Sequence, residues 1–156
     1  MKGRLFCAFA PVLAAGLLLV PAPAAAQRLD LAISPLNISF PLSDPDTVPI
    51  VSSLTAQLTY RVRQNNNQPW TLTVLAMGDL ISGLSTVDIG SVSWIATPAP
   101  PFQNGTLSKT VAQRLAGGVG NINPTATGQI AFRLANSWNY TAGLYTQTIV
   151  FTLAAP

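Results

Sequence analysis

The chain has 156 residues, of which 49% are hydrophobic and only 8% are charged, with a formal net charge of +3. Typical soluble domains contain roughly 25% charged residues, so uncharged side chains must supply most of the polar surface here. The length suits one domain and excludes two ordinary ones.

The first 26 residues have the pattern of a secretory signal peptide. Lys2 and Arg4 precede an apolar run over residues 5–20, and small residues follow at Ala24 and Ala26. The run is shorter than the ~20 residues that a membrane-spanning helix needs. We therefore predict cleavage after Ala26, a single mature domain over residues 27–156, and a location in the periplasm, at the cell surface or outside the cell.

The composition of residues 27–156 limits the chemistry of the mature protein. This part has no His, no Cys and no Glu, which excludes disulfides, a Ser-His-Asp triad and the common zinc, haem and iron–sulfur ligand sets. Six basic and five acidic residues leave a net charge of +1, too little to attract nucleic acid. We predict a non-enzymatic protein with no catalytic residue, cofactor, metal or nucleic-acid partner.

Aspartates are the remaining candidates for metal binding. Asp44 and Asp46 form a D-P-D sequence, and Asp79 and Asp88 lie in other expected turns. Calcium takes six to eight oxygen ligands, but aspartate also favours turns because its side chain accepts hydrogen bonds from nearby backbone. The dense alternation of a strong calcium-binding loop is absent, so we interpret these aspartates as turn residues.

The predicted elements are all strands. One or two entry strands, over residues 29–33 and 36–40, are interrupted by Pro35. Apolar and polar residues alternate over 54–63 and again over 70–76, as in strands with one buried face, and a turn at 65–67 separates the two runs. We expect this pair to form an antiparallel hairpin.

Shorter strands follow in the second half of the chain, over residues 87–89, 92–96, 106–111, 130–134 and 145–153. Prolines at 98, 100 and 101 predict a surface loop or edge crossing, and residues 117–120 predict a Gly-rich hairpin loop. About seven to nine short strands indicate an all-β, immunoglobulin-like antiparallel β-sandwich. The aromatic core is predicted to contain Tyr60, Trp70, Trp94, Phe132, Tyr145 and Phe151.

Two other aromatic residues have a different setting. Trp138 and Tyr140 lie in a polar stretch before the last strand. They form either an exposed platform that binds a sugar or a peptide, or a plug in which one of them closes the end of the sandwich. The sequence leaves both interpretations open.

Trp70-Thr71-Leu72 and the closing segment 143–153, which contains Phe151 and Leu153, carry a family resemblance. Together they are similar to the bacterial WxL cell-wall-binding domain, whose closing segment has a second tryptophan where Phe151 stands here. The resemblance implies a β-sandwich displayed at the cell surface and attached non-covalently to the envelope, with Trp70, Leu72, Phe151 and Leu153 at motif positions.

The ending Gly143-Leu144-Tyr145, followed by alternating Thr and aliphatic residues, is also similar to spore coat U and Csu-type pilus subunits. That resemblance implies completion of the fold by a strand from a neighbouring subunit. Residues 29–40 are the candidate donor.

These observations support three hypotheses. The leading one is an exported structural or adhesive module that contacts a cell-wall polymer or another envelope protein. The second is a fimbrial-type subunit that forms homo-oligomers by donating residues 29–40. The third is a carbohydrate-binding module that uses Trp138 and Tyr140.

Overall fold

The computed structural model describes residues 27–37, 39–64 and 67–156. The predicted leader and Ile38 of the predicted entry strand lie outside the described residues. One turn of 3-10 helix, η1 (Ile89–Ser91), is present among many strands. Within the described ranges, no helix has the length and apolarity needed to cross a membrane.

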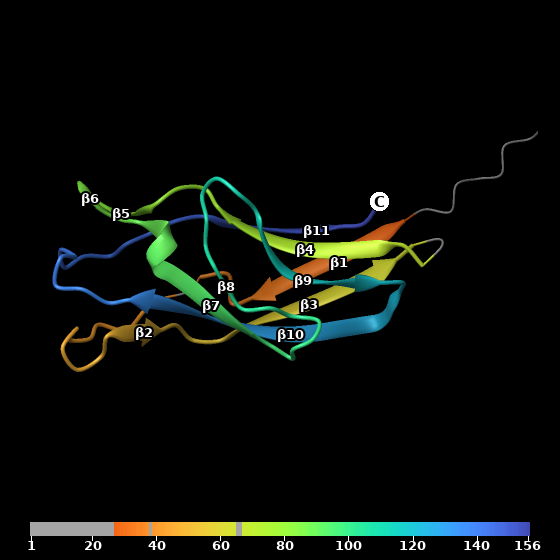
Figure 1. The fold of residues 1–156 in the computed structure, drawn as a ribbon, viewed down its shortest axis with the longest axis horizontal. Helices are drawn as coiled ribbons and strands as arrows, with labels where there is room; N and C mark the ends of the chain where they lie inside the picture. The colour runs from red at the N-terminus through yellow and green to blue at the C-terminus, as the bar shows by residue number, and fades with distance from the viewer. Residues whose placement is uncertain (1–26, 38, 65–66) are drawn as a thin grey trace, which may run out of the picture.

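The strands form three antiparallel sheets (Figure 1). Their bounds in chain order are β1 (Arg28–Ser34), β2 (Ile50–Ser52), β3 (Ala56–Arg63), β4 (Pro69–Ala76), β5 (Leu80–Ser82), β6 (Ser85–Val87), β7 (Val92–Thr97), β8 (Gly105–Thr106), β9 (Gln113–Val119), β10 (Ile122–Ala135) and β11 (Ile149–Ala154). One sheet has the order β1-β3-β10-β7-β8, with β2 also paired to β10; the second has the order β11-β4-β9, and β5 pairs with β6.

The core lies between the two larger sheets. Residues at alternate positions of β3, β4, β7 and β10 are buried, as the period of two predicts. Four of the predicted aromatic residues, Tyr60, Trp70, Trp94 and Phe132, are at most 2% exposed. The predicted antiparallel β-sandwich is therefore confirmed.

The expected hairpin between residues 54–63 and 70–76 is wrong. β3 and β4 belong to different sheets, so the chain crosses from one layer to the other between them. The inward side chains of the two strands meet across the core, where the ring centroids of Tyr60 and Trp70 are 5.3 Å apart. A short connection between two strands fixes their proximity but not whether they pair or face each other.

The predicted aromatic core also needs two corrections. Tyr145 lies outside the core, because it precedes β11 and its hydroxyl donates a hydrogen bond to the Thr141 carbonyl at 2.9 Å. Phe102, in the proline-rich stretch, is instead buried and packs edge-on against Tyr60, with ring centroids 5.8 Å apart. Its burial follows from Gly128, because a side chain there would collide with the Phe102 ring.

Three predicted local elements differ from the structure. Gly117 and Gly118 lie within β9 instead of a loop, and only Gly120, with φ of +87°, has a conformation that turns require. The predicted strand at 106–111 is reduced to β8, and the described residues of the second entry segment, 36–40, form no strand. At Gly118 a Cβ would lie 3.1 Å from the Trp70 ring, so glycine lets β9 approach that ring.

Candidate functional site

The first half of the predicted W-x-L motif lies inside the sandwich. Trp70 and Leu72 are buried on the inner face of β4. β11 pairs with β4 in a register that places Leu153 opposite Leu72 and Phe151 opposite Val74. The structure therefore brings the two halves of the motif together, but Trp70 and Leu72 provide packing and no accessible surface.

Phe151 and Leu153 have a different environment, because β11 is an edge strand. β1 is the edge strand of the other sheet, and residues of the two strands contact each other at one side of the sandwich. We call this edge the seam. Six partly buried apolar side chains pack against the core there: Leu29, Leu31 and Ile33 from β1, and Ile149, Phe151 and Leu153 from β11.

On the β1 side of the seam, every second residue has backbone N–H and C=O groups that pair with no other strand among the described residues. Ser53, which follows β2, donates its backbone N–H to the Phe132 carbonyl. Phe132 and the other even-numbered residues of β10 therefore direct their backbone N–H and C=O groups towards the side of β10 on which β2 and β3 lie. The registers of β10 with β3 and of β3 with β1 then direct the N–H and C=O of Arg28, Asp30 and Ala32 towards β3. Leu29, Leu31 and Ile33, which alternate with these residues, therefore direct their backbone N–H and C=O groups into the seam.

The β11 side follows the same alternation. Met77 donates its backbone N–H to the Thr148 carbonyl at 2.9 Å, so the even-numbered residues 150, 152 and 154 face β4. Ile149, Phe151 and Leu153 consequently direct their N–H and C=O groups into the seam. Among the described residues, no backbone hydrogen bond joins β1 to β11.

An apolar groove of about 410 Å³ runs along the seam. At one end the Gln27 side chain donates a hydrogen bond to the Pro156 carbonyl at 3.1 Å. The residues that line the groove are Leu31, Ala32, Ile33, Leu36, Ile149 and Phe151. Covering each 100 Å² of such apolar surface stabilises a complex by ~2.5 kcal/mol before the entropic cost of association.

The two residues of the predicted aromatic platform, Trp138 and Tyr140, differ in exposure and in hydrogen-bond partner. Trp138 is 67% exposed, and its indole N–H donates to the Asp46 carboxylate at 2.9 Å. Tyr140 is half-buried, with its hydroxyl 3.4 Å from that of Ser91 in η1. Trp138 is thus the only exposed indole in the described part of the chain, and Tyr140 is held against the body of the sandwich.

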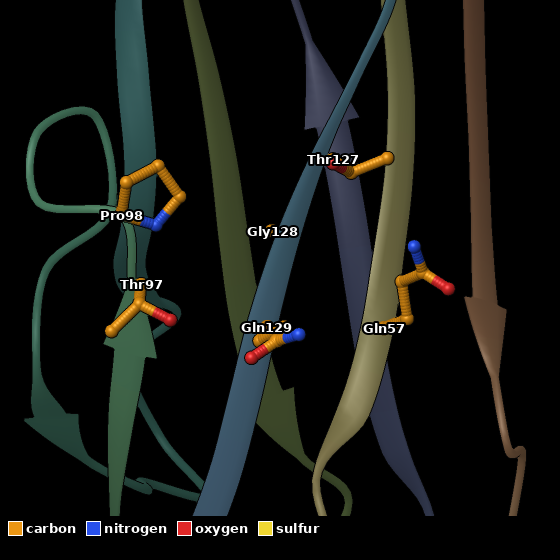
Figure 2. Close-up of a pocket in the computed structure, with 6 residues that line it drawn as sticks. All are labelled: Gln57, Thr97, Pro98, Thr127, Gly128 and Gln129. Carbon is orange, nitrogen blue, oxygen red and sulfur yellow. The ribbon is translucent and has the colours of Figure 1, made fainter.

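A polar pocket of about 290 Å³ lies on the outer face of the six-stranded sheet (Figure 2). Gln57 of β3 is opposite Gln129 of β10, which is opposite Thr97 of β7. The full lining is Gln57, Thr97, Pro98, Thr127, Gly128 and Gln129. Our sequence reasoning missed this pocket; a proline directly after an alternating run, as at Thr97-Pro98, is the signal that marks the end of a ladder.

The titratable groups form one notable pair. Lys109 contacts the Asp79 carboxylate at 2.6 Å, and Asp79 also accepts the backbone N–H of Ile89. The hydrogen bond from Lys109, followed by that from Ile89, lowers the pKa of Asp79, and the same pair raises the pKa of Lys109. This pair joins the residue directly before β5 to the segment after β8.

Asp44 and Asp88, also predicted as turn residues, each accept a hydrogen bond from a backbone N–H two residues later in the chain. Asp44 accepts the backbone N–H of Asp46 at 2.9 Å, and Asp88 accepts that of Gly90 at 3.2 Å. Within the described ranges, no group of three or more His, Cys, Asp or Glu residues is arranged to hold a metal ion.

Comparison of the sequence with protein families and with curated proteins finds no match.

Proposed function

We propose that this chain is an exported, non-enzymatic β-sandwich with a structural or adhesive role at the bacterial cell surface or envelope. Its partner is another polypeptide, which adds an extended strand at the seam. One observation carries this proposal: both edges of the seam combine half-buried apolar side chains with unpaired backbone N–H and C=O groups.

The chemistry of the seam favours a protein over a cell-wall polymer as the partner. A strand inserted there can donate and accept backbone hydrogen bonds with the outward groups of β1 and β11. Its alternate side chains can fill the apolar groove, which a sugar polymer rich in hydroxyl groups would fill less well. Non-covalent retention in the envelope would then depend on another envelope protein.

Envelope retention of the full chain, expressed in a bacterium that carries the partner, tests this proposal. Leu31→Lys places a charge on an inward side chain that lines the groove, and Ser34→Lys is its control at an exposed position of β1 outside the groove. We expect the wild type and Ser34→Lys to sediment with the envelope and Leu31→Lys to be released. Equal retention of a folded Leu31→Lys variant would contradict the proposal.

A fimbrial-type subunit is the second candidate, and the attachment of β1 favours it. β1 pairs with β3 of its own chain over Arg28–Ser34, but the connection to β2 runs through residues 35–49 with four prolines. The described residues of that connection contain no strand. Such a long connection would let β1 pair with β3 of a second copy by the same contacts.

A further inference from the structure

Half of the basic residues in residues 27–156 lie together on two neighbouring strands. This part of the chain contains six Arg and Lys residues, of which Arg28 belongs to β1 and Arg61 and Arg63 belong to β3. β1 begins beside the end of β3 (Figure 1). The three arginines alternate with inward-facing residues, so they lie on the outer face of the six-stranded sheet. We call them the arginine cluster.

The register of the two strands places two of these cations opposite each other. Arg28 is the direct partner of Arg63, and Asp30 is the direct partner of Arg61. Side chains at such positions have Cβ atoms roughly 5 Å apart, and like charges there destabilise the sheet. The Asp30 carboxylate forms its ion pair with Arg28, at 3.0 Å. Three arginines and one aspartate therefore leave a local net charge of +2.

Arg61 has few partners for a half-buried cation. Its Nη2 donates to the Asn123 side-chain oxygen at 3.3 Å, and its Nε–H is buried with no hydrogen-bond partner in the described part of the chain. Across the described ranges, neither Arg61 nor Arg63 forms an ion pair with a carboxylate. A nearby anion would stabilise such a partly desolvated guanidinium group. Because no described side chain supplies that anion, the cluster is suited to an anionic ligand.

The chemistry of the cluster favours phosphate over carboxylate. Each guanidinium group presents its N–H donors in a rigid fork that matches the oxygens of either anion. A carboxylate carries one negative charge, whereas a phosphate monoester carries nearly two at neutral pH and offers three acceptor oxygens. The local charge of +2 and the three forks therefore match a phosphate monoester better.

We propose that the arginine cluster binds a phosphate monoester, carried by a small molecule or by a membrane lipid. Arg63 is central, because it lies directly across from Arg28 and about 7 Å along β3 from Arg61. It binds the phosphate, and Arg28 and Arg61 donate their free Nη groups to the remaining oxygens. The site does not depend on strand addition at the seam.

The test is an NMR titration of the ¹⁵N-labelled full chain, purified after export, at neutral pH and low salt. The probe is glycerol 3-phosphate, and acetate is the carboxylate comparison. We expect saturable shifts of the Nε–H signals of Arg28, Arg61 and Arg63 with glycerol 3-phosphate, and no saturable shift with acetate. Arg133, which is exposed on the same outer face near the other end of β10, should not respond.

Variants separate the site from the overall charge of the protein. Arg63→Gln should weaken binding of glycerol 3-phosphate about 10-fold, whereas Arg133→Gln removes an equal charge and should leave the affinity unchanged. Asp30→Asn should tighten binding, because it releases Arg28 from its ion pair. Asp88→Asn changes the net charge by the same amount and should have no effect.

Phosphatidylcholine vesicles with and without phosphatidic acid distinguish the two sources of the phosphate. Sedimentation with phosphatidic acid vesicles alone, reversed by glycerol 3-phosphate, would assign a lipid headgroup. A chain that binds glycerol 3-phosphate without sedimenting would assign a soluble ligand. Equal affinity for acetate, no saturable shift at Arg63, or an unchanged affinity in Arg63→Gln would each overturn the proposal.

Discussion

At the scale of single residues, the contact between Gly128 and Phe102 explains how a proline-rich loop contributes a core residue. Phe102 is 2% exposed, and a Cβ at position 128 would collide with its ring. We predict that Gly128→Ala lowers the free energy of unfolding by about 1–3 kcal/mol through overpacking. Urea denaturation measures this change.

Two comparisons make the Gly128 prediction specific. Gly90→Ala, where the nearest atom to a Cβ is the flexible Asp88 carboxylate at 3.2 Å, should cost less. Combining Gly128→Ala with Phe102→Leu should give a total loss smaller than the sum of the single losses. Strict additivity of the two substitutions would show that the collision does not occur.

The ion pair between Asp79 and Lys109 gives a residue-level prediction about pH. The Lys109 hydrogen bond lowers the pKa of Asp79, so its stabilisation is present above the unfolded value of about 4 and is lost as pH falls through the folded value. Asp79→Asn should therefore destabilise the protein at pH 7, and this loss should shrink as pH falls below 4 and disappear below the lowered pKa of Asp79. The measurement is the urea midpoint at each pH.

The control for this prediction is Asp30→Asn. Asp30 forms its ion pair with Arg28 two residues away, and both side chains are largely exposed. We expect a much smaller change at pH 7, because exposed pairs contribute little to stability. Parallel pH curves for the wild type and Asp79→Asn, down to acid unfolding, would refute a role for the Asp79 pair.

At the scale of elements, β1 determines which of the two proposed assemblies is correct. Its inward residues cover the core, and its pairing partner is β3. Deleting residues 27–34 should lower the unfolding temperature, because β3 loses its neighbour. If β1 can pair between copies, a peptide of residues 27–35 added in trans should restore that temperature.

The same peptide experiment has an informative control. A peptide with Leu31→Lys should restore less stability, because its charge would lie against the core. Concentration-dependent polymers of the full chain, seen by light scattering, should then disappear when residues 27–34 are deleted. Failure of the peptide to bind a folded, truncated protein would rule out strand donation by β1 and leave the seam as a site for other chains.

At the scale of the whole molecule, the period of two was sufficient to predict β3, β4, β7 and the second half of β10, which together supply most of the core. Leu58, Tyr60 and Val62 are buried as their alternation predicts. The partner of each strand was not predictable in this way, because β3 and β4 are joined by a short connection yet face each other across the core. The sequence did not predict the burial of Phe102, because the neighbouring prolines interrupt the alternating pattern that would identify an inward side chain.

The candidate sites depend on pairing between distant strands more than the individual strands and the core do. The resemblance to the WxL domain places Phe151 at a motif position. Its position at the seam, however, results from the strand order β11-β4-β9, which the local sequence does not determine. The sequence left open whether Trp138 and Tyr140 are exposed or close the end of the sandwich: Trp138 is exposed, whereas Tyr140 is half-buried and its hydroxyl contacts Ser91 of η1. The polar pocket beside Thr97 and Gln129 becomes visible only when the register of β10 with β7 is known.

The open seam is the central feature of this molecule, and amide hydrogen exchange of the purified monomer tests it most directly. We predict slow exchange at Asp30 and Ala32, which bond to β3, and fast exchange at Leu31, Ile33 and Phe151, which face the seam. Equally strong protection of both groups in the monomer would show that β1 and β11 pair with each other, and would contradict a seam that accepts a strand.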